Sequence, residues 1–305
     1  MSNANFNYGL PYVGSKSAIA EWVMAHLPRA KHFYDVFAGG CAITHCAMRM
    51  NKYEIYHIND IINTPQFFLN AINGKYQNEN NRWVSKMEFY ANKENDPIVK
   101  YVWSFAYNGM YYCYSDDLVP YQQALHKLTT NNNLNPKQKL HLIKNIICEY
   151  NKLNKKYSDS TLLIVKSTNT INRINSLQSL KPFVQNIRTY NLDYRELSFE
   201  DDAIIYCDPP YHNTDKRMYD KGTKNFNHDE FYEWCELQTQ PTFISEYYMP
   251  ENKFVEIDNV IKFSKASQTK TKHTTEKIFI PKKQVDLICN HYNKYDEKDN
   301  NLFKL

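Results

Sequence analysis

The four residues Asp208-Pro209-Pro210-Tyr211 place a carboxylate, rigid carbonyls and an aromatic ring side by side in the chain. They follow residues 203–207, an apolar run typical of a buried strand, and the prolines end that strand because neither donates a backbone hydrogen bond. Open α/β sheets bind ligands at the carboxyl ends of their strands. There, Asp208 and a proline carbonyl would accept the two hydrogens of an exocyclic amine, and Tyr211 would stack on its planar ring. The alternative is an Asp-Pro turn with a surface tyrosine.

A strand, a glycine turn and a helix are predicted over residues 33–50. The turn contains Gly39 and Gly40, two of only seven glycines in the chain. A ligand can approach the backbone closely at such a turn, which leads into the amino end of a helix. The turn is neither Gly-x-Gly-x-x-Gly nor a Gly-Lys-Ser/Thr loop, so it gives little support to a dinucleotide or nucleoside triphosphate site. A glycine turn without any ligand is the alternative.

An acidic residue follows the next predicted strand, residues 54–58. Asp60 stands roughly 20 residues beyond the glycine turn, where an acid can accept both hydroxyls of a ribose; a plain turn residue is the alternative. Upstream, Ser15 is placed to cap a helix whose first turn contains Lys16, an ammonium available to a carboxylate or phosphate. A capped surface helix with a solvated Lys16 explains that pattern equally well. Together, the glycine turn, the spaced Asp60 and the Asp208 turn are difficult to explain by chance.

The composition limits the class of protein. A chain of 305 residues, of which 42% are hydrophobic, can form one large domain or two of ordinary size. Its net charge of +4 permits a polyanionic partner without requiring one. The seven cysteines form no Cys-x-x-Cys pair and no zinc spacing, which favours free thiols in a reducing cytosol and no metal site. No secretion signal or membrane-spanning run is found, so we expect a soluble intracellular protein without a membrane partner.

Four motifs of this chain resemble, in the same order, those of the Dam-type N6-adenine DNA methyltransferases: Tyr12-Val13-Gly14-Ser15-Lys16, Asp35-Val36-Phe37-Ala38-Gly39-Gly40, Asn59-Asp60 and Asp208-Pro209-Pro210-Tyr211. The likeness covers about residues 8–72 and 186–281. It implies an α/β fold, with a Rossmann-like S-adenosylmethionine-dependent methyltransferase sheet and an inserted, mostly helical recognition domain. One departure is Asp35-Val36, where family members often have Glu-Pro. Another is Cys41, where a small residue or glycine is commoner.

The resemblance also implies a binding site for S-adenosylmethionine, which leaves as S-adenosylhomocysteine. Asp35 and the backbone of the glycine turn would hold the methionine portion, and Asp60 the ribose. Asp193 would lie beside the cofactor's adenine; a plain turn residue is the alternative there. The implied cofactor-binding residues are Tyr12, Lys16, Asp35, Phe37, Ala38, Gly39, Gly40, Asp60, Ile61, Asp193 and Asp208. The implied catalytic residues are Asp208, Pro209, Pro210 and Tyr211.

The pattern of elements predicts two domains and a tail. A discontinuous catalytic domain would comprise residues 1–72 and 186–290, with a recognition domain inserted at residues 73–185 and a tail at residues 291–305. The insert breaks the α/β alternation of the rest of the chain. It contains a lysine-rich helical pattern over residues 137–156, with six lysines against one glutamate.

Four segments carry the residues expected to contact DNA: the aromatic stretch 101–112, a predicted helix at 171–180, the polar segment 212–228 and the basic segment 262–283. The basic segment has seven lysines against one glutamate. Aromatic rings can stack on or wedge between bases, and lysines can contact phosphates. The residues named for this role are Tyr107, Asn108, Tyr111, Arg173, Lys216, Arg217, Tyr219, Lys265, Lys270 and Lys272. The alternatives are aromatic rings buried in a core, a surface loop without substrate contact, and solvated lysines.

The resemblance implies site-specific methyl transfer from S-adenosylmethionine to N6 of an adenine flipped out of double-stranded DNA. A bacterial or phage-infected cytoplasm, a cognate restriction endonuclease in a restriction-modification system, and a monomer or weak dimer fit the same hypothesis. Methylation of RNA adenine or of cytosine N4 would use much the same turn, so both stay open. A DNA-binding protein without turnover is disfavoured by the intact residues 208–211, and an NAD oxidoreductase by the missing glycine fingerprint.

Overall fold

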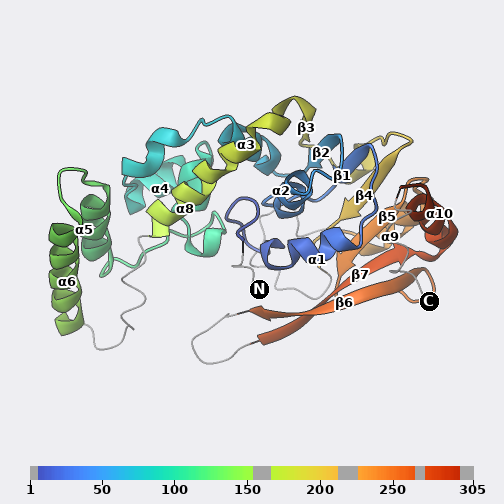
Figure 1. Cartoon of the computed structure of the whole chain (residues 1–305). Coiled ribbons are helices and arrows are strands. Elements are labelled where there is room, and N and C mark those ends of the chain that lie inside the picture. The colour runs from blue at the N-terminus through green and yellow to red at the C-terminus, as the bar shows by residue number, and fades with distance from the viewer. Residues whose placement is uncertain (1–5, 154–165, 212–225, 265–271, 296–305) are drawn as a thin grey trace. The chain divides into compact units, whose positions relative to one another are not determined.

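The computed structural model describes residues 6–153, 166–211, 226–264 and 272–295. The chain forms two units (Figure 1). The first unit contains residues 1–10, 14–73 and 179–305, and the second contains residues 11–13 and 74–178. Among the described residues, no helix has both the length and the apolar character needed to cross a membrane.

The first unit is built on a seven-stranded sheet. Its strands are β1 (His32–Asp35), β2 (Ile55–Asn59), β3 (Ile187–Tyr190), β4 (Ala203–Cys207), β5 (Thr242–Glu246), β6 (Phe254–Ser264) and β7 (Lys272–Pro281). They lie in the order β3-β2-β1-β4-β5-β7-β6, and the pairs from β3 to β5 are parallel. β7 runs antiparallel to both of its neighbours and forms a long hairpin with β6 (Figure 1). This sheet confirms the α/β, Rossmann-like methyltransferase fold expected from the sequence.

The register of the central strands brings three acidic positions to one edge of the sheet. Asp35, the last residue of β1, pairs with Ile58 of β2 and with Tyr206 of β4. Asp60 and Asp208 each stand two residues beyond those partners. Because adjacent parallel strands end on the same side of a sheet, the three carboxylates are gathered at that edge. All five residues of β4 are buried, which explains why this strand is a continuous apolar run.

Helices cover the faces of the sheet. They are η1 (Ser17–Ile19), α1 (Ala20–Ala25), α2 (Ala42–Arg49), α3 (Thr64–Ile72), η6 (Tyr194–Glu196), α9 (His228–Leu237), η9 (Lys282–Gln284) and α10 (Val285–Tyr295), and η5 (Leu177–Asn186) leads into β3. Asn227 caps α9, since its side chain accepts from the amides of Asp229 and Glu230. α10 runs across residue 290, the position at which we expected the catalytic domain to end.

Strand β3 is preceded directly by η5. Residues 184–186 belong to η5, and β3 starts at Ile187. Ile187 pairs with Tyr56, and β2 itself begins only one residue earlier, at Ile55. Residues 184 and 185 therefore have no residue of β2 opposite them, and they are part of the 3₁₀ segment.

The described part of the second unit is mainly helical. Its elements are η2 (Gln77–Asn81), α4 (Lys86–Asn92), η3 (Ile98–Val102), η4 (Phe105–Tyr107), α5 (Val119–Thr130), α6 (Pro136–Leu153) and α8 (Lys166–Ser176). α5 and α6 lie side by side (Figure 1), and Tyr121 of α5 meets Tyr150 of α6 edge to face at 5.1 Å between ring centroids. The lysine-rich pattern that begins at residue 137 is thus a helix as expected, with Tyr150 on its buried side.

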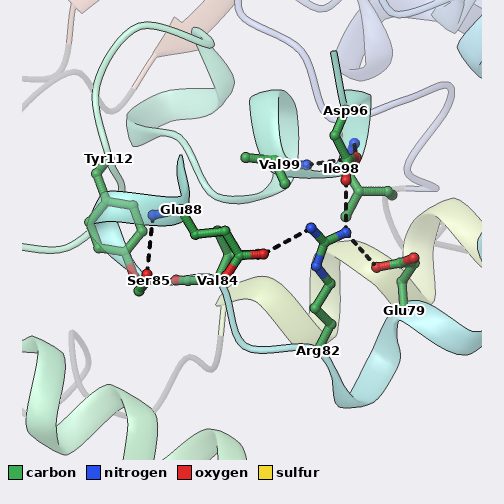
Figure 2. A network of polar contacts seen from close by, with 9 residues as sticks. All are labelled: Glu79, Arg82, Val84, Ser85, Glu88, Asp96, Ile98, Val99 and Tyr112. Carbon is green, nitrogen blue, oxygen red and sulfur yellow. Dashed lines mark hydrogen bonds and ion pairs between the residues drawn. The ribbon is translucent and has the colours of Figure 1, made fainter. Parts of the chain in front are cut away.

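Arg82 ties three elements of this unit together (Figure 2). Its guanidinium lies 2.7 Å from Asp96, 2.9 Å from Glu88 and 3.3 Å from Glu79. Asp96 also accepts from the amides that begin η3, and Glu88 lies in α4. One cation with three partly buried carboxylates forms a network, so its members hold η2, α4 and η3 in a single arrangement.

Residues 104–112 form a loop, called here the aromatic loop, whose two ends are joined by backbone pairing. Ser104 and Tyr112 form an antiparallel bridge, and the Phe105 amide donates to the Tyr111 carbonyl at 2.7 Å. The Tyr112 hydroxyl donates to the carbonyl of Val84 at 2.7 Å, next to the helix cap Ser85 in Figure 2. The base of the loop is therefore anchored to the start of α4.

Candidate active site

The turn after β4 places its carboxylate in contact with a lysine from the beginning of the chain. The Nζ atom of Lys16 lies 2.8 Å from Oδ1 of Asp208, and the two side chains are 7% and 18% exposed. Pro209 is buried and Pro210 is half-buried, so the turn lies within the protein. Lys16 is thus not a solvated lysine at the start of a surface helix, which was one alternative from the sequence.

Two further residues complete this group. Glu276, the fifth residue of β7, accepts from the Tyr211 hydroxyl at 2.6 Å and lies 3.8 Å from Nζ of Lys16. The Lys16 ammonium also stands 4.5 Å above the centroid of the Tyr211 ring. Burial, together with the charges of Asp208 and Glu276, raises the pKa of Tyr211 well above its ordinary value, so its hydroxyl keeps the proton that it donates. We call Lys16, Asp208, Tyr211 and Glu276 the strand-end cluster.

Tyr211 is a buried residue and not the surface tyrosine of the alternative interpretation. One face of its ring meets the Lys16 ammonium, and the ring of Tyr247 meets it edge to face with centroids 4.5 Å apart. The sequence did not point to Glu276, because a single glutamate in a lysine-rich segment carries no motif. Its closeness to Tyr211 follows from the antiparallel course of β7, which is a feature of the tertiary structure.

The glycine turn and Asp60 form one unit of backbone structure. The Gly39 amide donates to Oδ2 of Asp60 at 2.7 Å, and the Ile62 amide donates to Oδ1 at 3.0 Å. The Ala38 amide donates to the Asn59 carbonyl at 2.9 Å. Gly39 has φ +48°, a left-handed conformation in which glycine carries no Cβ penalty. Asp60 therefore ties the glycine turn to the segment that follows β2.

Two carboxyls at this edge, those of Asp35 and Asp60, have raised pKa values. Burial raises the pKa of Asp35 to about 7; the hydrogen bond from the Thr44 hydroxyl at 2.6 Å opposes that rise, and the charge of Asp208 adds to it. Burial likewise raises the pKa of Asp60 to about 6 against its two backbone hydrogen bonds. Burial is the main cause of both rises, and the charge of Asp208 adds a smaller part. A cationic ligand at this edge would favour the ionised forms of both carboxyls.

The chain segment before the first helix packs directly on the glycine turn. The Leu10 amide donates to the Gly40 carbonyl at 2.7 Å, and the Gly9 amide donates to Nδ1 of His45 in α2 at 2.9 Å. A Cβ on Gly9 would lie 2.3 Å from the Gly40 oxygen, and Gly9 has φ +69°. A side chain at this position would therefore push the segment away from the turn.

Replacing Gly9 with alanine should weaken cofactor binding by about tenfold or more, because the left-handed strain alone costs roughly 1–2 kcal/mol and the clash with Gly40 adds to it. Titration calorimetry with the methyl donor measures the effect. Gly74→Ala is the matched control: Gly74 has φ +81°, but its Cβ would first meet the flexible side chain of Gln77 in the second unit. Equal losses of cofactor affinity in both variants would contradict a specific role for Gly9.

The remaining predicted cofactor residues have varied surroundings. Ile61 is exposed beside Asp60. Phe37 packs against Tyr194, with ring centroids 5.4 Å apart. Asp193 caps η6 and makes a two-point contact with the Arg195 guanidinium, which lowers the pKa of that carboxyl. The pairing with Arg195 was not foreseen from the sequence.

Tyr12 belongs to the second unit, where its ring centroid lies 6.0 Å from that of Tyr101. Arg173 of α8 is half-buried near Tyr107, and burial lowers the pKa of its guanidinium. Among the described residues, no three His, Cys, Asp or Glu side chains are grouped to hold a metal ion.

The aromatic side chains in and next to the aromatic loop differ in their exposure to solvent. Phe105 and Tyr111 are 60% and 62% exposed, whereas Trp103 and Tyr112 are buried. The loop has positive φ at Tyr107, +61°, a conformation that is uncommon outside glycine. Phe105 was not singled out from the sequence, because neighbouring aromatics in one stretch give no sign of which ring faces water.

Asn108 serves the structure of the same loop. Its side-chain oxygen accepts from the amides of Met110 and Tyr111 at 2.8 and 3.4 Å. The predicted DNA contacts Lys216, Arg217, Tyr219, Lys265 and Lys270 lie outside the described residues. Lys272 is the first residue of β7, but its side chain is likewise not described.

A model of the D12 class N6 adenine-specific DNA methyltransferase family matches residues 12–278 of the chain. The chain belongs to this family. The resemblance to the Dam-type enzymes is thereby confirmed, and the protein is an enzyme that methylates N6 of adenine in DNA. Its substrates are therefore DNA and a methyl-donor cofactor. Membership favours DNA adenine over the RNA and cytosine N4 alternatives. A search of curated proteins finds no match to this chain.

Proposed function

We propose that S-adenosylmethionine is the methyl donor and that it binds at the carboxyl ends of β1 and β2. When bound, it supplies an activated methyl group on a positively charged sulfur. The support is electrostatic: the register of β1 and β2 brings Asp35 and Asp60 to one edge of the sheet, and a cationic ligand there would favour the ionised forms of these two carboxyls, whose pKa values burial raises. Asp60 would hold the ribose, Asp35 and the glycine turn the methionine portion, and the exposed Ile61 would contact the adenine ring.

The raised pKa values predict how cofactor affinity depends on pH. The ionised carboxylates favour a cationic ligand, so affinity should rise by about tenfold between pH 5.5 and 8 as Asp60 and Asp35 lose their protons, with pKa values of about 6 and about 7. Titration calorimetry in buffers of different ionisation enthalpy should detect proton release near pH 6. S-adenosylhomocysteine, which lacks the sulfonium charge, is the control and should show a weaker dependence. Equal pH profiles for both ligands would contradict the electrostatic argument.

We infer that Asp208 and the Pro209 carbonyl accept the two hydrogens of the target amine. The position of Lys16 supports this: a nitrogen donor lies 2.8 Å from Asp208 and above the Tyr211 ring, as the amino group of a stacked base would. The amine lone pair is conjugated with its ring and is a poor nucleophile. Two acceptors would favour a pyramidal nitrogen aimed at the methyl group, and the positioning would provide most of the acceleration. Asp208 would stabilise the positive charge that develops on the amine nitrogen as the new bond forms, and only then would one amine proton pass to the Asp208 carboxylate.

The target adenine would have to leave the duplex to reach this turn, since the turn is largely buried. Extruding a base costs on the order of a few kcal/mol. Stacking on Tyr211 and contacts with phosphates would offset that cost. The lysines around residues 262–283, together with residues 216, 217 and 219, remain the candidates for backbone contacts.

We propose that the aromatic loop contacts bases through Phe105 and Tyr111. Both rings are mostly exposed, although apolar rings of this size are usually buried, and the loop that carries them is anchored at its base. Exposed aromatics on a rigid support can stack on bases at little cost in conformational entropy.

Replacing Phe105 and Tyr111 together with serine should weaken DNA binding by roughly 1–3 kcal/mol per lost ring contact. Because the rings carry no charge, the salt dependence of binding should not change. Fluorescence anisotropy at several salt concentrations measures both quantities. Tyr90→Ser is the matched control, since Tyr90 is an exposed tyrosine of α4 outside the loop. Wild-type affinity in the double variant would exclude the loop as a DNA-contacting surface.

Methylation sequencing of DNA from cells that express the protein tests the proposed function as a whole. We expect N6-methyladenine at one short recognition sequence, and none in cells that express Asp208→Ala. The sequence so found would also identify a cognate restriction endonuclease, if the enzyme belongs to a restriction-modification system. As part of the same proposal, the enzyme acts as a monomer or weak dimer in the cytoplasm of a bacterial or phage-infected cell. Methyl groups at random adenines or on cytosine would contradict the proposal.

A further inference from the structure

Glu276 is a buried carboxylate that the reaction described above does not use. It is 2% exposed, and β7 carries it to the edge of the sheet where the parallel strands end. The residue after it, Lys277, pairs with Glu246, the last residue of β5. Because β7 is antiparallel to β5, an early residue of β7 lies where β5 finishes. This places Glu276 beside the catalytic turn, although the two are far apart in sequence.

A buried carboxylate is stable only with partners that replace water. Two partners of Glu276 among the described contacts belong to the strand-end cluster. It accepts from the Tyr211 hydroxyl at 2.6 Å and lies 3.8 Å from the Lys16 ammonium. The same ammonium lies closer to Asp208, at 2.8 Å. One lysine thus stands between two carboxylates and is bonded to the nearer of them.

The target amine and the Lys16 ammonium cannot share the same place. The ammonium contacts Oδ1 of Asp208 and lies above the Tyr211 ring, which is where the proposed function would place the target amine. When the base enters, the ammonium has to move, and removing it from every carboxylate inside the protein would be costly. Glu276 is the second carboxylate already within 4 Å of it. A shift of the ammonium toward Glu276 would uncover both the acceptor and the ring.

We propose that Glu276 is a positioning residue for methyl transfer: it holds the Tyr211 hydroxyl and receives the Lys16 ammonium when the target amine takes its place on Asp208. This inference rests on the proposed role of Asp208. In the free enzyme, the Lys16 ammonium would occupy the position that the target amine takes in the complex. Entry of the base then exchanges one nitrogen donor on Asp208 for another.

The first test is Glu276→Gln, which keeps the size of the side chain and an oxygen acceptor for Tyr211 but removes the charge that attracts Lys16. We expect kcat to fall by about ten- to a hundredfold at saturating cofactor. Lys16 would stay on Asp208 in this variant and would hold the target base out of line with the methyl group. Cofactor affinity and thermal stability should stay close to those of the wild type. Glu256→Gln is the matched control, since Glu256 lies on the same hairpin and pairs with Lys277 outside the cluster.

A double-mutant cycle with Lys16→Met separates positioning from a merely structural role. Without the lysine there is no ammonium to displace, so Glu276→Gln should cost about threefold or less in that background, at saturating cofactor. Equal losses of kcat in both backgrounds would overturn the proposal. If Glu276→Gln does not fold, Tyr211→Phe carries the test, since it removes only the hydroxyl that Glu276 holds. A several-fold loss of kcat with unchanged cofactor affinity would support the proposal, and wild-type kcat would overturn it.

A measurement without turnover completes the design. 2-Aminopurine placed next to the target adenine becomes brighter when that adenine leaves the stack, so its fluorescence reports base extrusion while the target keeps its 6-amino group. We expect Glu276→Gln to reduce that signal, and Lys16→Met to restore part of it. Full activity in Asp208→Ala would refute the proposed function itself. An inactive Asp208→Ala together with a wild-type Glu276→Gln would instead refute only the role of Glu276.

Discussion

Replacing Asp208 with alanine should reduce methyl transfer by about 10³- to 10⁴-fold, because both the acceptor for the target amine and the stabilising negative charge are lost. Cofactor binding should largely survive, since Asp60 and the glycine turn do not depend on Asp208 for their hydrogen bonds. Removing one negative charge should lower the pKa of Asp35, which the charge of Asp208 helps to raise. Single-turnover transfer of labelled methyl groups to DNA, together with calorimetric cofactor binding, measures both effects.

Two variants serve as controls for that experiment. Asp208→Asn keeps one oxygen acceptor without the charge and should show an intermediate loss, on the order of 10²-fold. Asp258→Ala removes a carboxylate of the same sheet whose partners are Trp22 and His26, so it should leave transfer unchanged. Full activity in Asp208→Ala would exclude this residue from the chemistry.

Replacing Asp60 with alanine should raise the dissociation constant of the methyl donor by roughly 30- to 1000-fold, equivalent to about 2–4 kcal/mol for lost hydrogen bonds to a charged group. Two roles of Asp60 contribute to this expected loss of cofactor affinity. Its oxygens hold the amides of Gly39 and Ile62, and it is the proposed partner of the ribose. Without it, the glycine turn loses its tie to the end of β2. Calorimetry measures the affinity, and saturating cofactor should recover most of kcat.

Asp60→Asn distinguishes the two contributions. Its one oxygen can still accept a backbone amide, so the turn should be partly preserved while the ribose contact is weakened. Thr64→Val is a suitable control, since Thr64 is a buried polar residue of α3 that follows the same turn without bonding to the glycine loop in the described contacts. An Asp60→Ala variant with wild-type cofactor affinity would exclude Asp60 from the binding site.

Local patterns in the sequence predicted much of the sheet correctly. The strand before Asp208 was expected at residues 203–207 and is found there, because a fully buried parallel strand is a continuous apolar run. Glycine turns and strand-end acids are likewise visible as short motifs, since the residues that make them are neighbours in the chain. Helices without a strong apolar stripe, such as α4 and α5, were not predicted, because their helical state depends on packing such as the Arg82 network.

By itself, the sequence determined the family, the α/β class and the order of the four family motifs, at residues 12–16, 35–40, 59–60 and 208–211. These features are carried by residues that lie side by side in the chain, where spacing alone is informative. Only the tertiary structure decided that Lys16 meets Asp208, that Glu276 meets Tyr211, and that Phe105 is exposed while Trp103 is buried. Contacts between distant segments depend on which strands become neighbours and in which direction they run. The burial of a ring depends on which side chains pack on it. No single stretch of sequence specifies either these contacts or this burial.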